Sequence, residues 1–554
     1  MDSLAIGDTK RIFSRDVIGG GPKSIAGVIN QIEIDNCNIQ IIRAEDFLFK
    51  DEEFLKRYDI CLISAMTMDK LAVKRVVNFW RTINSEKIVI IGGPIASDSN
   101  ILKKLNADIA VMGEGEKKVA ATIKILINNT LKINAESIIS LKNISGITFR
   151  YKENIVKTKP SLSLNQEEYN HYSNPKFFID YIAHYNNYRA ARIYVEILRG
   201  CSNYFRTKFR LINSYDCINT CNKCEESYIG DRTSCPALIP PGCGFCSTIG
   251  SFGAPKSRER DFILTEIKEL LKLGANRILL GAPDFLDYKR QDLIEKRILT
   301  NPRIPPEPNY DVLDDLIDRI IAFSPIREEK AQIFIENVKA SLCTDRALKI
   351  LSKIPNCIVS MGCETGSDQL AKKLGRPNKP SEILKVIKKA KSYGIRVHIY
   401  FVHSLPGERV EDIKASIDLI QMFYKLGVDK ITIYKYQDFP GAPFFYLQNK
   451  TKLLWKNNKK LNQYRKKLKK LVINFNRKKK EEMIGNKYRI FIAEPSFINP
   501  NDCIGYIIKG GPKVLIKESL SDLGKIVDIR IKNLVSDKLI EGEIILSNKN
   551  SNIK

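Results

Sequence analysis

The sequence lacks long apolar segments. No run of about 18 uncharged apolar residues occurs among its 554 residues, so it predicts no transmembrane helix. Its first residues, MDSLAIGDTKRIFSRD, lack the apolar segment of a secretory signal. Both absences favour a cytoplasmic protein with no membrane partner, in which cysteines stay reduced.

Metal-binding side chains are scarce in the first third of the chain. The sequence has four histidines, and none precedes His171. Residues 1–190 offer two cysteines, Cys37 and Cys61. A group bound in this part would have no histidine ligand and could not be held by three thiols.

Acidic residues are outnumbered, with 63 Asp and Glu against 90 Lys and Arg, which gives a net charge of +27. A basic chain favours a polyanionic partner, although Lys is frequent throughout, so the distribution of charge matters more than its sum. Residues 450–489 hold 16 Lys or Arg against two Glu. Apolar residues recur there at helical spacing, at Leu454, Leu461, Tyr464, Leu468, Leu471 and Phe475. This pattern predicts a basic amphipathic helix over 450–482, with a cationic face that is either solvated or bound to RNA.

Residues 1–130 alternate apolar runs with helical patterns, which predicts an α/β domain of the Rossmann-like (flavodoxin-like) kind. Strands are expected at 39–42, 59–64, 87–94 and 107–116. Ligands of such domains bind at the carboxyl ends of the strands, where glycines let the backbone approach closely. The candidates here are Ser64, Gly92, Gly93, Gly113 and Gly115. Residues 131–190 are predicted to form a linker containing a hairpin.

Seven of the 13 cysteines fall between Cys201 and Cys246. Clustered reduced thiols indicate a metal centre rather than disulfides. One set is Cys201, which follows a predicted strand, with Cys243 and Cys246, which precede a predicted helix. The other set, Cys217, Cys221 and Cys224, has the spacing CxxxCxxC, and Cys235 lies close by.

Residues 191–445 contain a series of short motifs that resembles the one in the radical SAM superfamily. In order, the motifs are YVEILRGC, PPGCGFC, GAPD, GCETGSD, LPGE and FPGAP. The resemblance implies a partial β/α barrel in which three cysteines hold a 4Fe–4S cluster. Its open iron would bind S-adenosylmethionine, and a donor such as ferredoxin or flavodoxin would reduce it. Context favours Cys201, Cys243 and Cys246 for this cluster. Cys217, Cys221, Cys224 and Cys235 would then hold zinc or a second iron–sulfur cluster, unless CxxxCxxC is itself the cluster site.

The same resemblance implies further site residues. The segment Gly281, Ala282, Pro283 and Asp284 would bind the methionine moiety of S-adenosylmethionine, and Glu364 would lie near its ribose. The front domain resembles the cobalamin-binding domain that precedes many radical SAM enzymes, with cobalamin bound without a histidine ligand. A domain that has lost its cofactor, or that binds a nucleotide, is the alternative.

Residues 483–554 contain short strands separated by Gly and Asn turns, which predicts a small OB-like β-barrel. The phrase GYIIKGGPKV resembles the TRAM domain of tRNA-modifying enzymes, which implies RNA contacts. The candidates are Tyr488, Tyr506, Lys509 and Lys513.

Together these resemblances imply a radical SAM enzyme that cleaves S-adenosylmethionine to a 5′-deoxyadenosyl radical and methylates an unactivated carbon through cobalamin, with RNA as the favoured substrate. The alternatives are methylation of a protein side chain, a tRNA methylthiotransferase-like reaction, or an RNA-binding protein with a structural metal cluster. The methylthiotransferase reaction needs three N-terminal cysteines, and residues 1–190 have two.

Overall fold

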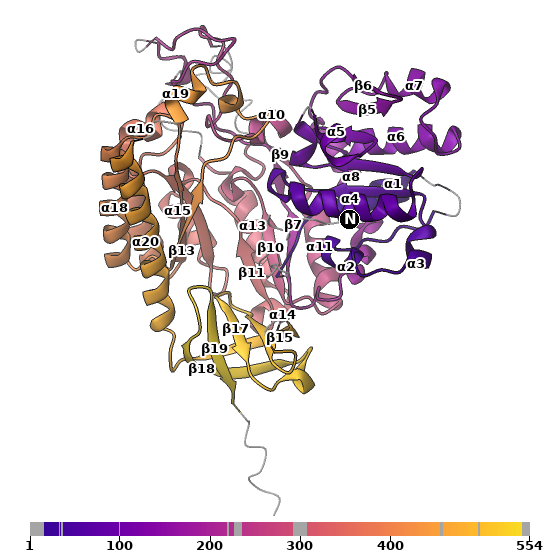
Figure 1. The fold of residues 1–554 in the computed structure, drawn as a ribbon. Coiled ribbons are helices and arrows are strands. Elements are labelled where there is room, and N and C mark those ends of the chain that lie inside the picture. The colour runs from indigo at the N-terminus through magenta and orange to yellow at the C-terminus, as the bar shows by residue number, and fades with distance from the viewer. Residues whose placement is uncertain are drawn as a thin grey trace, which may run out of the picture.

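The computed structural model describes residues 16–545 except 33, 35–36, 99, 219–220, 226–234, 292–306, 455–457 and 497–498. It consists of a front domain, a central core and a small barrel, seen at the right, in the middle and at the bottom of Figure 1. In this part of the chain, no helix is long and apolar enough to cross a membrane.

The front domain is a five-stranded sheet with helices on both faces. Its strands, in spatial order, are β2 (Ile60–Ser64), β3 (Ile88–Gly92), β4 (Ile109–Val111), β5 (Ile147–Tyr151) and β6 (Asn154–Lys157). The first three are parallel, and the β5–β6 hairpin is antiparallel. The hairpin thus extends the front sheet, which corrects its assignment to a linker over 131–190.

Alternation along the strands explains why both faces are covered. On β3, Val89 and Ile91 pack with helices α4 (Lys70–Ile83) and α5 (Ile101–Leu105). Ile88 and Ile90 face the opposite side. The remaining helices of this domain are α1 (Gly21–Gln31), α2 (Ala44–Phe47), α3 (Glu52–Lys56), α6 (Glu116–Asn128) and α7 (Ala135–Leu141).

The strand expected at 39–42 is not formed, because residues 37–42 adopt neither helix nor strand. The backbone N–H of Ile41 donates to Nδ1 of His184 at 3.1 Å instead of to a neighbouring strand. Ile41 is nevertheless buried, and it packs in the core rather than in the front sheet.

The core is an arc of parallel strands, as the sequence predicts. One sheet has the order β1 (Val17–Ile18), β7 (Arg192–Glu196), β10 (Arg277–Gly281), β11 (Gln332–Ile335), and the next has β12 (Ile358–Glu364), β13 (Arg396–His403), β14 (Lys430–Lys435). A hydrogen bond from Val338 N to Ser360 O, 2.9 Å long, joins the two sheets beyond β11. The pairing of β1 with β7 corrects the assignment of all of residues 1–130 to the front domain.

Helices enclose the outside of this arc (Figure 1). They include α11 (Arg260–Lys272), α13 (Tyr310–Ile321), α14 (Ser324–Arg327), α15 (Asp345–Leu351), α17 (Pro380–Ser392) and α18 (Val410–Lys425). The other helices of this part of the chain are α8 (Gln166–Tyr172), α10 (Thr248–Phe252), α16 (Asp368–Lys373) and α19 (Lys450–Leu454). The expected helix face of α11 is buried at Ile263, Ile267 and Leu270, and Gly274 follows its end with φ +85°. A short pair, β8 (Leu198–Arg199) and β9 (Lys256–Ser257), brackets the cysteine-rich segment.

The predicted basic helix is α20 (Lys459–Glu481), which packs on the outside of the core against α18 and β14. Its buried residues are Leu461, Leu468, Val472 and Phe475, while Tyr464 and Leu471 are half-buried. The side chain of Leu454 lies outside the described residues. The apolar stripe of this helix is therefore covered, and its polar face is left at the surface.

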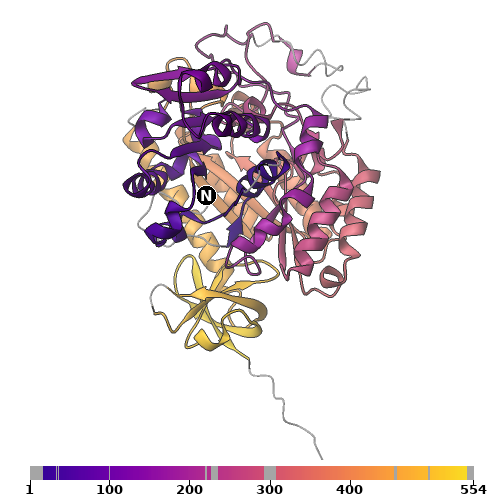
Figure 2. The ribbon, with the colours of Figure 1, turned by 90° about the vertical axis from the view of Figure 1, so that its right-hand side faces the viewer.

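The C-terminal region closes into a five-stranded barrel, as predicted for an OB-like domain. Its order is β15 (Lys487–Pro495), β16 (Cys503–Ile507), β17 (Lys513–Ile516), β19 (Leu539–Ile544), β18 (Ile526–Leu534). Figure 2 shows the barrel below the core. Arg277 and Arg396, the first residues of β10 and β13, contact it through the Tyr506 ring and the Lys509 carbonyl. The barrel therefore lies at the amino ends of the core strands.

Candidate active site

A cavity of about 1200 Å³ lies between the front domain and the core. The front domain lines it with all five predicted strand-end residues, Ser64, Gly92, Gly93, Gly113 and Gly115. The core lines it with Gly281, Ala282 and Pro283, at the carboxyl end of β10. Parallel strands of both domains thus direct their carboxyl ends to one space, as ligand sites of α/β proteins do.

Glycine is required at Gly93. Its φ is +81°, and a Cβ atom there would lie 2.7 Å from the carbonyl oxygen of Ala65. The backbone at the end of β3 therefore approaches the loop after β2 more closely than any other residue type allows.

Ion pairs between Arg199 and two glutamates fix the front domain against the core beside this cavity. Glu116 lies 2.5 Å and Glu114 3.3 Å from the Arg199 guanidinium, and all three side chains are largely buried. Glu114 also pairs with Lys256 at 3.1 Å. All four residues of the GEGE segment line the cavity, and the two glutamates also form ion pairs with the core.

Burial alone would raise the pKa of Glu116, but Arg199 holds that pKa below its ordinary value. A second buried link joins Lys23 of α1 to Glu266 of α11. The pKa of Glu266 is also lowered by its cationic partners against burial, so Glu116 and Glu266 both stay charged at neutral pH.

The thiols of Cys201, Cys243 and Cys246 are brought together next to the core strands. Burial is the main reason that the pKa of Cys201 is raised to about 11; the ammonium of Lys339 opposes this shift, and the charges of Asp287, Cys246 and Cys243 contribute to it. Cys243 Sγ accepts hydrogen bonds from Asn203 Nδ2 at 3.2 Å and from Arg376 at 3.4 Å. Donors of this kind stabilise a thiolate, which is the form that binds metal.

The CxxxCxxC cysteines lie apart from this group, in the excursion between Ser202 and Gly242. Lys208 Nζ donates to Cys217 Sγ at 3.3 Å, and Arg206 donates to Cys224 Sγ at 3.6 Å. Burial would lower the pKa of Lys208, but the hydrogen bond to Cys217 and the nearby Cys224 and Cys221 raise it.

Neither set of cysteines forms a site for a single metal ion. Within the described part of the chain, no group of three or more His, Cys, Asp or Glu is placed to hold one. In a 4Fe–4S cluster each thiolate binds a different iron atom, so its sulfurs lie further apart than around one zinc ion. The set of Cys201, Cys243 and Cys246 fits a cluster, because its members are mutually close, largely buried and provided with hydrogen-bond donors.

The predicted S-adenosylmethionine residues divide into two groups. Gly281, Ala282 and Pro283 line the cavity, whereas the Asp284 carboxylate is completely buried. It accepts hydrogen bonds from the backbone of Leu286 and Lys339. The Asp284 side chain thus binds backbone groups of the core, and its contact with S-adenosylmethionine stays a prediction.

Glu364 lies on the same side of the core as the thiols. Its carboxylate is 3.6 Å from the Arg376 guanidinium, which also contacts Cys243. Burial raises the pKa of Glu364, and Arg376 opposes this shift. Its φ of +66° is in the left-handed region, which is uncommon for a residue other than glycine and marks sites of local strain.

Sequence reasoning missed a buried charged cluster beside Cys201. Lys339 Nζ lies 2.7 Å from Asp287 and 3.2 Å from Asp284, and Arg290 lies 2.6 Å from Asp287. The Ser202 hydroxyl donates to Asp287 at 2.7 Å. Burial would raise the pKa of Asp287, but Lys339 and Arg290 hold it well below its ordinary value. The signal in the sequence is the polar stretch ENVKAS, which contains Lys339 and follows the apolar run of β11.

Glu336 was also missed. It lines the cavity, accepts a hydrogen bond from Tyr194 Oη at 3.0 Å and accepts another from Ala282 N at 3.1 Å. Burial raises its pKa to about 7, despite these two hydrogen bonds. A carboxyl group that titrates near neutrality in a cavity is able to accept or donate a proton there.

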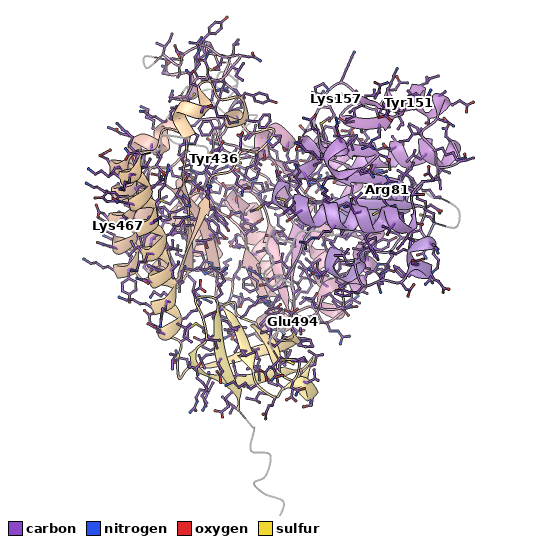
Figure 3. All side chains as sticks on the ribbon, viewed as in Figure 1. Arg81, Tyr151, Lys157, Tyr436, Lys467 and Glu494 are labelled. Atoms are coloured by element: carbon purple, nitrogen blue, oxygen red, sulfur yellow. The ribbon has the colours of Figure 1, made fainter. Side chains whose placement is uncertain are left out.

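The RNA candidates of the C-terminal barrel have different surroundings. Tyr506 is 2% exposed, and its hydroxyl donates to Glu494 at 2.6 Å. Figure 3 places Glu494 at the boundary of barrel and core. Tyr506 cannot stack on a base in this structure, so its predicted RNA contact is corrected to a role in docking the barrel.

Lys509 and Lys513 are also engaged. Lys509 pairs with Glu329 of the core, and Lys513 lies over the Tyr506 ring at 5.5 Å from its centroid. Tyr488 is half-buried against the interior of the barrel. Tyr506 and Lys509 therefore contribute to the contact between barrel and core, and the RNA contacts of Tyr488, Lys509 and Lys513 stay predictions.

Comparison with known proteins agrees with this geometry. Residues 240–420 match the sequence model of the Radical SAM superfamily. The fold resembles that of the radical S-adenosylmethionine methyltransferase TsrM from Kitasatospora setae, determined with tryptophan and a SAM analogue. The TM-score is 0.51 with 13% identity, over 78% of this chain and 75% of the other.

The strand arc and the superfamily match define a radical SAM protein, a class that implies a 4Fe–4S cluster and S-adenosylmethionine. Within this class, the chain belongs to the family of the uncharacterized protein MJ1620 of Methanocaldococcus jannaschii. The two are 36% identical over 548 residues, 98% of each chain. The uncharacterized protein MK0932 of Methanopyrus kandleri is 33% identical over 98% of this chain and 95% of its own.

Proposed function

We propose that this protein is a cobalamin-dependent radical SAM methyltransferase that acts on an unactivated carbon of a macromolecule, and that the macromolecule is RNA. One observation carries the proposal. A single cavity is lined on one side by the glycine-rich strand ends of the front domain and on the other by Gly281–Pro283 of the core. A cofactor held by the front domain would therefore face the ligand-binding edge of the core.

The cavity suits a large cofactor without a histidine ligand. Its volume of about 1200 Å³ exceeds the range of about 300–1,000 Å³ typical of small-molecule pockets. The described residues that line it include no histidine. Its glycines at the ends of β3 and β4 leave room for a flat ring system against the backbone.

Cys201, Cys243 and Cys246 are the residues that would hold the cluster. Bound there, the reduced cluster would supply the electron that cleaves S-adenosylmethionine. Asn203 and Arg376 would orient and stabilise the Cys243 thiolate by donating to its sulfur. The cations of Lys339 and Arg290 next to Cys201, which are largely shielded from solvent, would keep this end of the core polar.

The cluster assignment has a direct test. Anaerobically reconstituted protein with Cys243→Ala and Cys246→Ala is expected to lose reductive cleavage of S-adenosylmethionine. The matched variant with Cys221→Ala and Cys224→Ala is expected to retain it with dithionite as the reductant. The opposite result would assign the cluster to the CxxxCxxC set.

The cobalamin site is tested by Gly93→Ala, because the added Cβ would force the β3 loop away from Ala65. Wild-type protein is expected to retain cobalamin with a base-off spectrum, and this variant to retain several-fold less. Gly394→Ala is the control, since Gly394 also has a positive φ (+70°) but has open space at its Cβ position. Retention that is equal in all three proteins, or absent from wild type, contradicts the proposed site.

The RNA proposal rests on α20. Eight of its cations are exposed: Lys459, Lys460, Lys466, Lys467, Lys469, Lys470, Arg477 and Lys478. Figure 3 shows Lys467 on the outer side of the helix, away from the core. In Figure 1 the helix runs from the end that carries the cysteine-rich segment to the C-terminal barrel. This cationic strip suits a phosphate backbone.

Methyl transfer is the decisive measurement. The loaded enzyme is incubated with cellular RNA and S-adenosylmethionine carrying an isotope-labelled methyl group, and the digested nucleosides are analysed by mass spectrometry. We expect label on a carbon atom of one nucleoside, dependent on cobalamin. Label on co-incubated protein and none on RNA would replace RNA by a protein substrate.

A further inference from the structure

A second group of thiols lies outside the site described above. Cys217, Cys221, Cys224 and Cys235 all lie on the excursion between Ser202 and Gly242, and none is buried completely. A structural cysteine usually lies alone in an apolar core, as Cys357 and Cys503 do here. Four half-buried cysteines within 19 consecutive positions, 217–235, require another explanation.

The backbone brings the ends of this segment together. Tyr215 N donates to Ala237 O at 3.0 Å. Cys217 lies two residues after Tyr215, and Cys235 lies two residues before Ala237. This hydrogen bond therefore holds the two ends of the cysteine-containing segment next to each other. Both also pack against one apolar cluster that contains Leu211, Ile239 and Phe444.

Two cations are directed at the sulfurs. Lys208 Nζ donates to Cys217 Sγ at 3.3 Å and lies close enough to Cys221 and Cys224 to interact with them electrostatically. The guanidinium of Arg206 donates to Cys224 Sγ at 3.6 Å and to Ile239 O at 2.6 Å. Cationic donors of this kind suit sulfurs that bind metal as thiolates, because hydrogen bonds between ionised groups are the strong ones.

These cations are held by a rigid backbone. Lys208 N donates to Lys373 O at 2.9 Å, and Gly242 N donates to Phe205 O at 2.7 Å. At Gly375 a Cβ atom would meet the Arg206 backbone at 2.5 Å. Arg206 is 3% exposed. The donors are therefore in place before any metal binds.

From this arrangement we propose that Cys217, Cys221, Cys224 and Cys235 bind a second iron–sulfur cluster, whose negative charge Lys208 and Arg206 offset. A zinc site is disfavoured, because zinc–sulfur bonds of about 2.3 Å would draw the four sulfurs into a tight tetrahedron. The described residues contain no group gathered so closely. The same is true of the thiols proposed for the first cluster, so one kind of ligand accounts for both sets.

The second cluster would lie near the first. Arg206 pairs with Gly242 as an isolated bridge, and Gly242 directly precedes Cys243. Phe245, next to Cys246, packs on the same apolar cluster as Cys217 and Cys235. The inference is independent of cobalamin and of RNA.

The test is the metal content of anaerobically reconstituted full-length protein, measured as iron, sulfide and zinc per chain. Wild type is expected to hold about eight iron atoms, corresponding to two 4Fe–4S clusters. The variant with Cys217→Ala and Cys224→Ala is expected to hold about four and to keep cleavage of S-adenosylmethionine with dithionite. The variant with Cys243→Ala and Cys246→Ala is expected to hold about four without cleavage. Cys37→Ala, at an exposed cysteine outside both sets, serves as the control and should match wild type.

A measurement on wild type alone covers the case in which a variant fails to fold. Electron paramagnetic resonance of the reduced protein should show two cluster signals, and S-adenosylmethionine should change one of them. About four iron atoms in wild type, one zinc per chain, or a single signal would overturn the proposal. Loss of cleavage in the Cys217 and Cys224 variant, with retention in the Cys243 and Cys246 variant, would instead exchange the roles of the two sets.

Discussion

The guanidinium of Arg376 donates a hydrogen bond to the sulfur of Cys243 at 3.4 Å. The same group lies 3.6 Å from Glu364, so it serves a thiol and a buried carboxylate at once. Arginine suits this place because its planar fork presents several donors in fixed directions.

Arg376→Met should shift the reduction potential of the cluster to a more negative value. A positive charge near a cluster stabilises its reduced form, and the hydrogen bond to Cys243 is lost as well. The variant should also unfold more easily by about 1–3 kcal/mol, since Glu364 loses its charged partner. Spectroelectrochemical titration checks the potential. Arg376→Lys, which keeps the charge, should shift it less, and equal potentials in all three proteins would contradict this role.

Arg199→Met should weaken the attachment of the front domain. It leaves Glu114 and Glu116 buried with less compensation, which costs about 3–5 kcal/mol for a broken buried ion pair. Thermal unfolding followed by calorimetry checks this, with Lys56→Met as the control, because Lys56 pairs with Glu52 at the surface.

The effect of Arg199→Met should depend on pH. Arg199 lowers the pKa of Glu116 in the folded protein, so the pair contributes fully above the unfolded value near 4.5. The contribution is lost as the pH falls through the lowered folded pKa. The difference in melting temperature between variant and wild type should therefore shrink in acid; a constant difference would point to lost packing instead of lost charge.

Glu336→Gln should change the pH dependence of stability in the opposite sense. The folded pKa of Glu336 is about 7 against an ordinary 4.5, so the folded state binds a proton more tightly than the unfolded state. In wild type, the raised pKa of Glu336 therefore lowers the free energy of unfolding progressively as the pH rises from about 4.5 to about 7. A shift of this size corresponds to about 2–4 kcal/mol.

The amide of Glu336→Gln does not titrate, so the melting temperature of the variant relative to wild type should rise across that pH range. A flat difference from pH 5 to pH 8 would show that Glu336 is not the titrating group. The comparison is made at each pH within one buffer series.

Lys466→Gln with Lys470→Gln should weaken binding of RNA to full-length protein. Each phosphate contact that is lost should reduce the slope of log K against log salt by about one. The control is Lys385→Gln with Lys388→Gln, which removes two exposed lysines from α17 rather than α20. A fluorescence titration with cellular RNA over a salt series checks this. Equal slopes for the two double variants would mean that α20 is a solvated helix face.

Much of the architecture could be predicted because apolar periodicity is local. The runs around β2, β3 and β4, the pattern of α11 and the stripe of α20 each depend on neighbouring residues alone. The strand prediction for residues 39–42 was wrong for the same reason. An apolar run indicates that a segment is buried, but it does not show that a neighbouring strand is there to pair with it. Here His184, far along the chain, takes the backbone hydrogen bond of Ile41.

The residues of the candidate site also fall into those that the sequence predicts and those that it does not. Glycines and cysteines could be found because their chemistry restricts where they occur. Lys339, Arg376 and Glu336 could not, because each is an ordinary residue type that gains its role from partners on other strands. Tyr506 shows the converse: an aromatic residue in a phrase typical of RNA-binding barrels is covered by the core.

The pairing of Val17 with Arg192 bears on how the chain is assembled. In the sequence, the front domain is an insertion between two neighbouring core strands, because the edge strand β1 precedes it and β7 follows it. During synthesis, β1 is made before its partner strand β7, which follows some 170 residues later. The front domain is complete before β7 is available, so we expect it to fold first and β1 to join the core sheet afterwards. A fragment cut after the front domain would keep β1 without its partner, so the domain is severed cleanly only when the first strand is removed with the core.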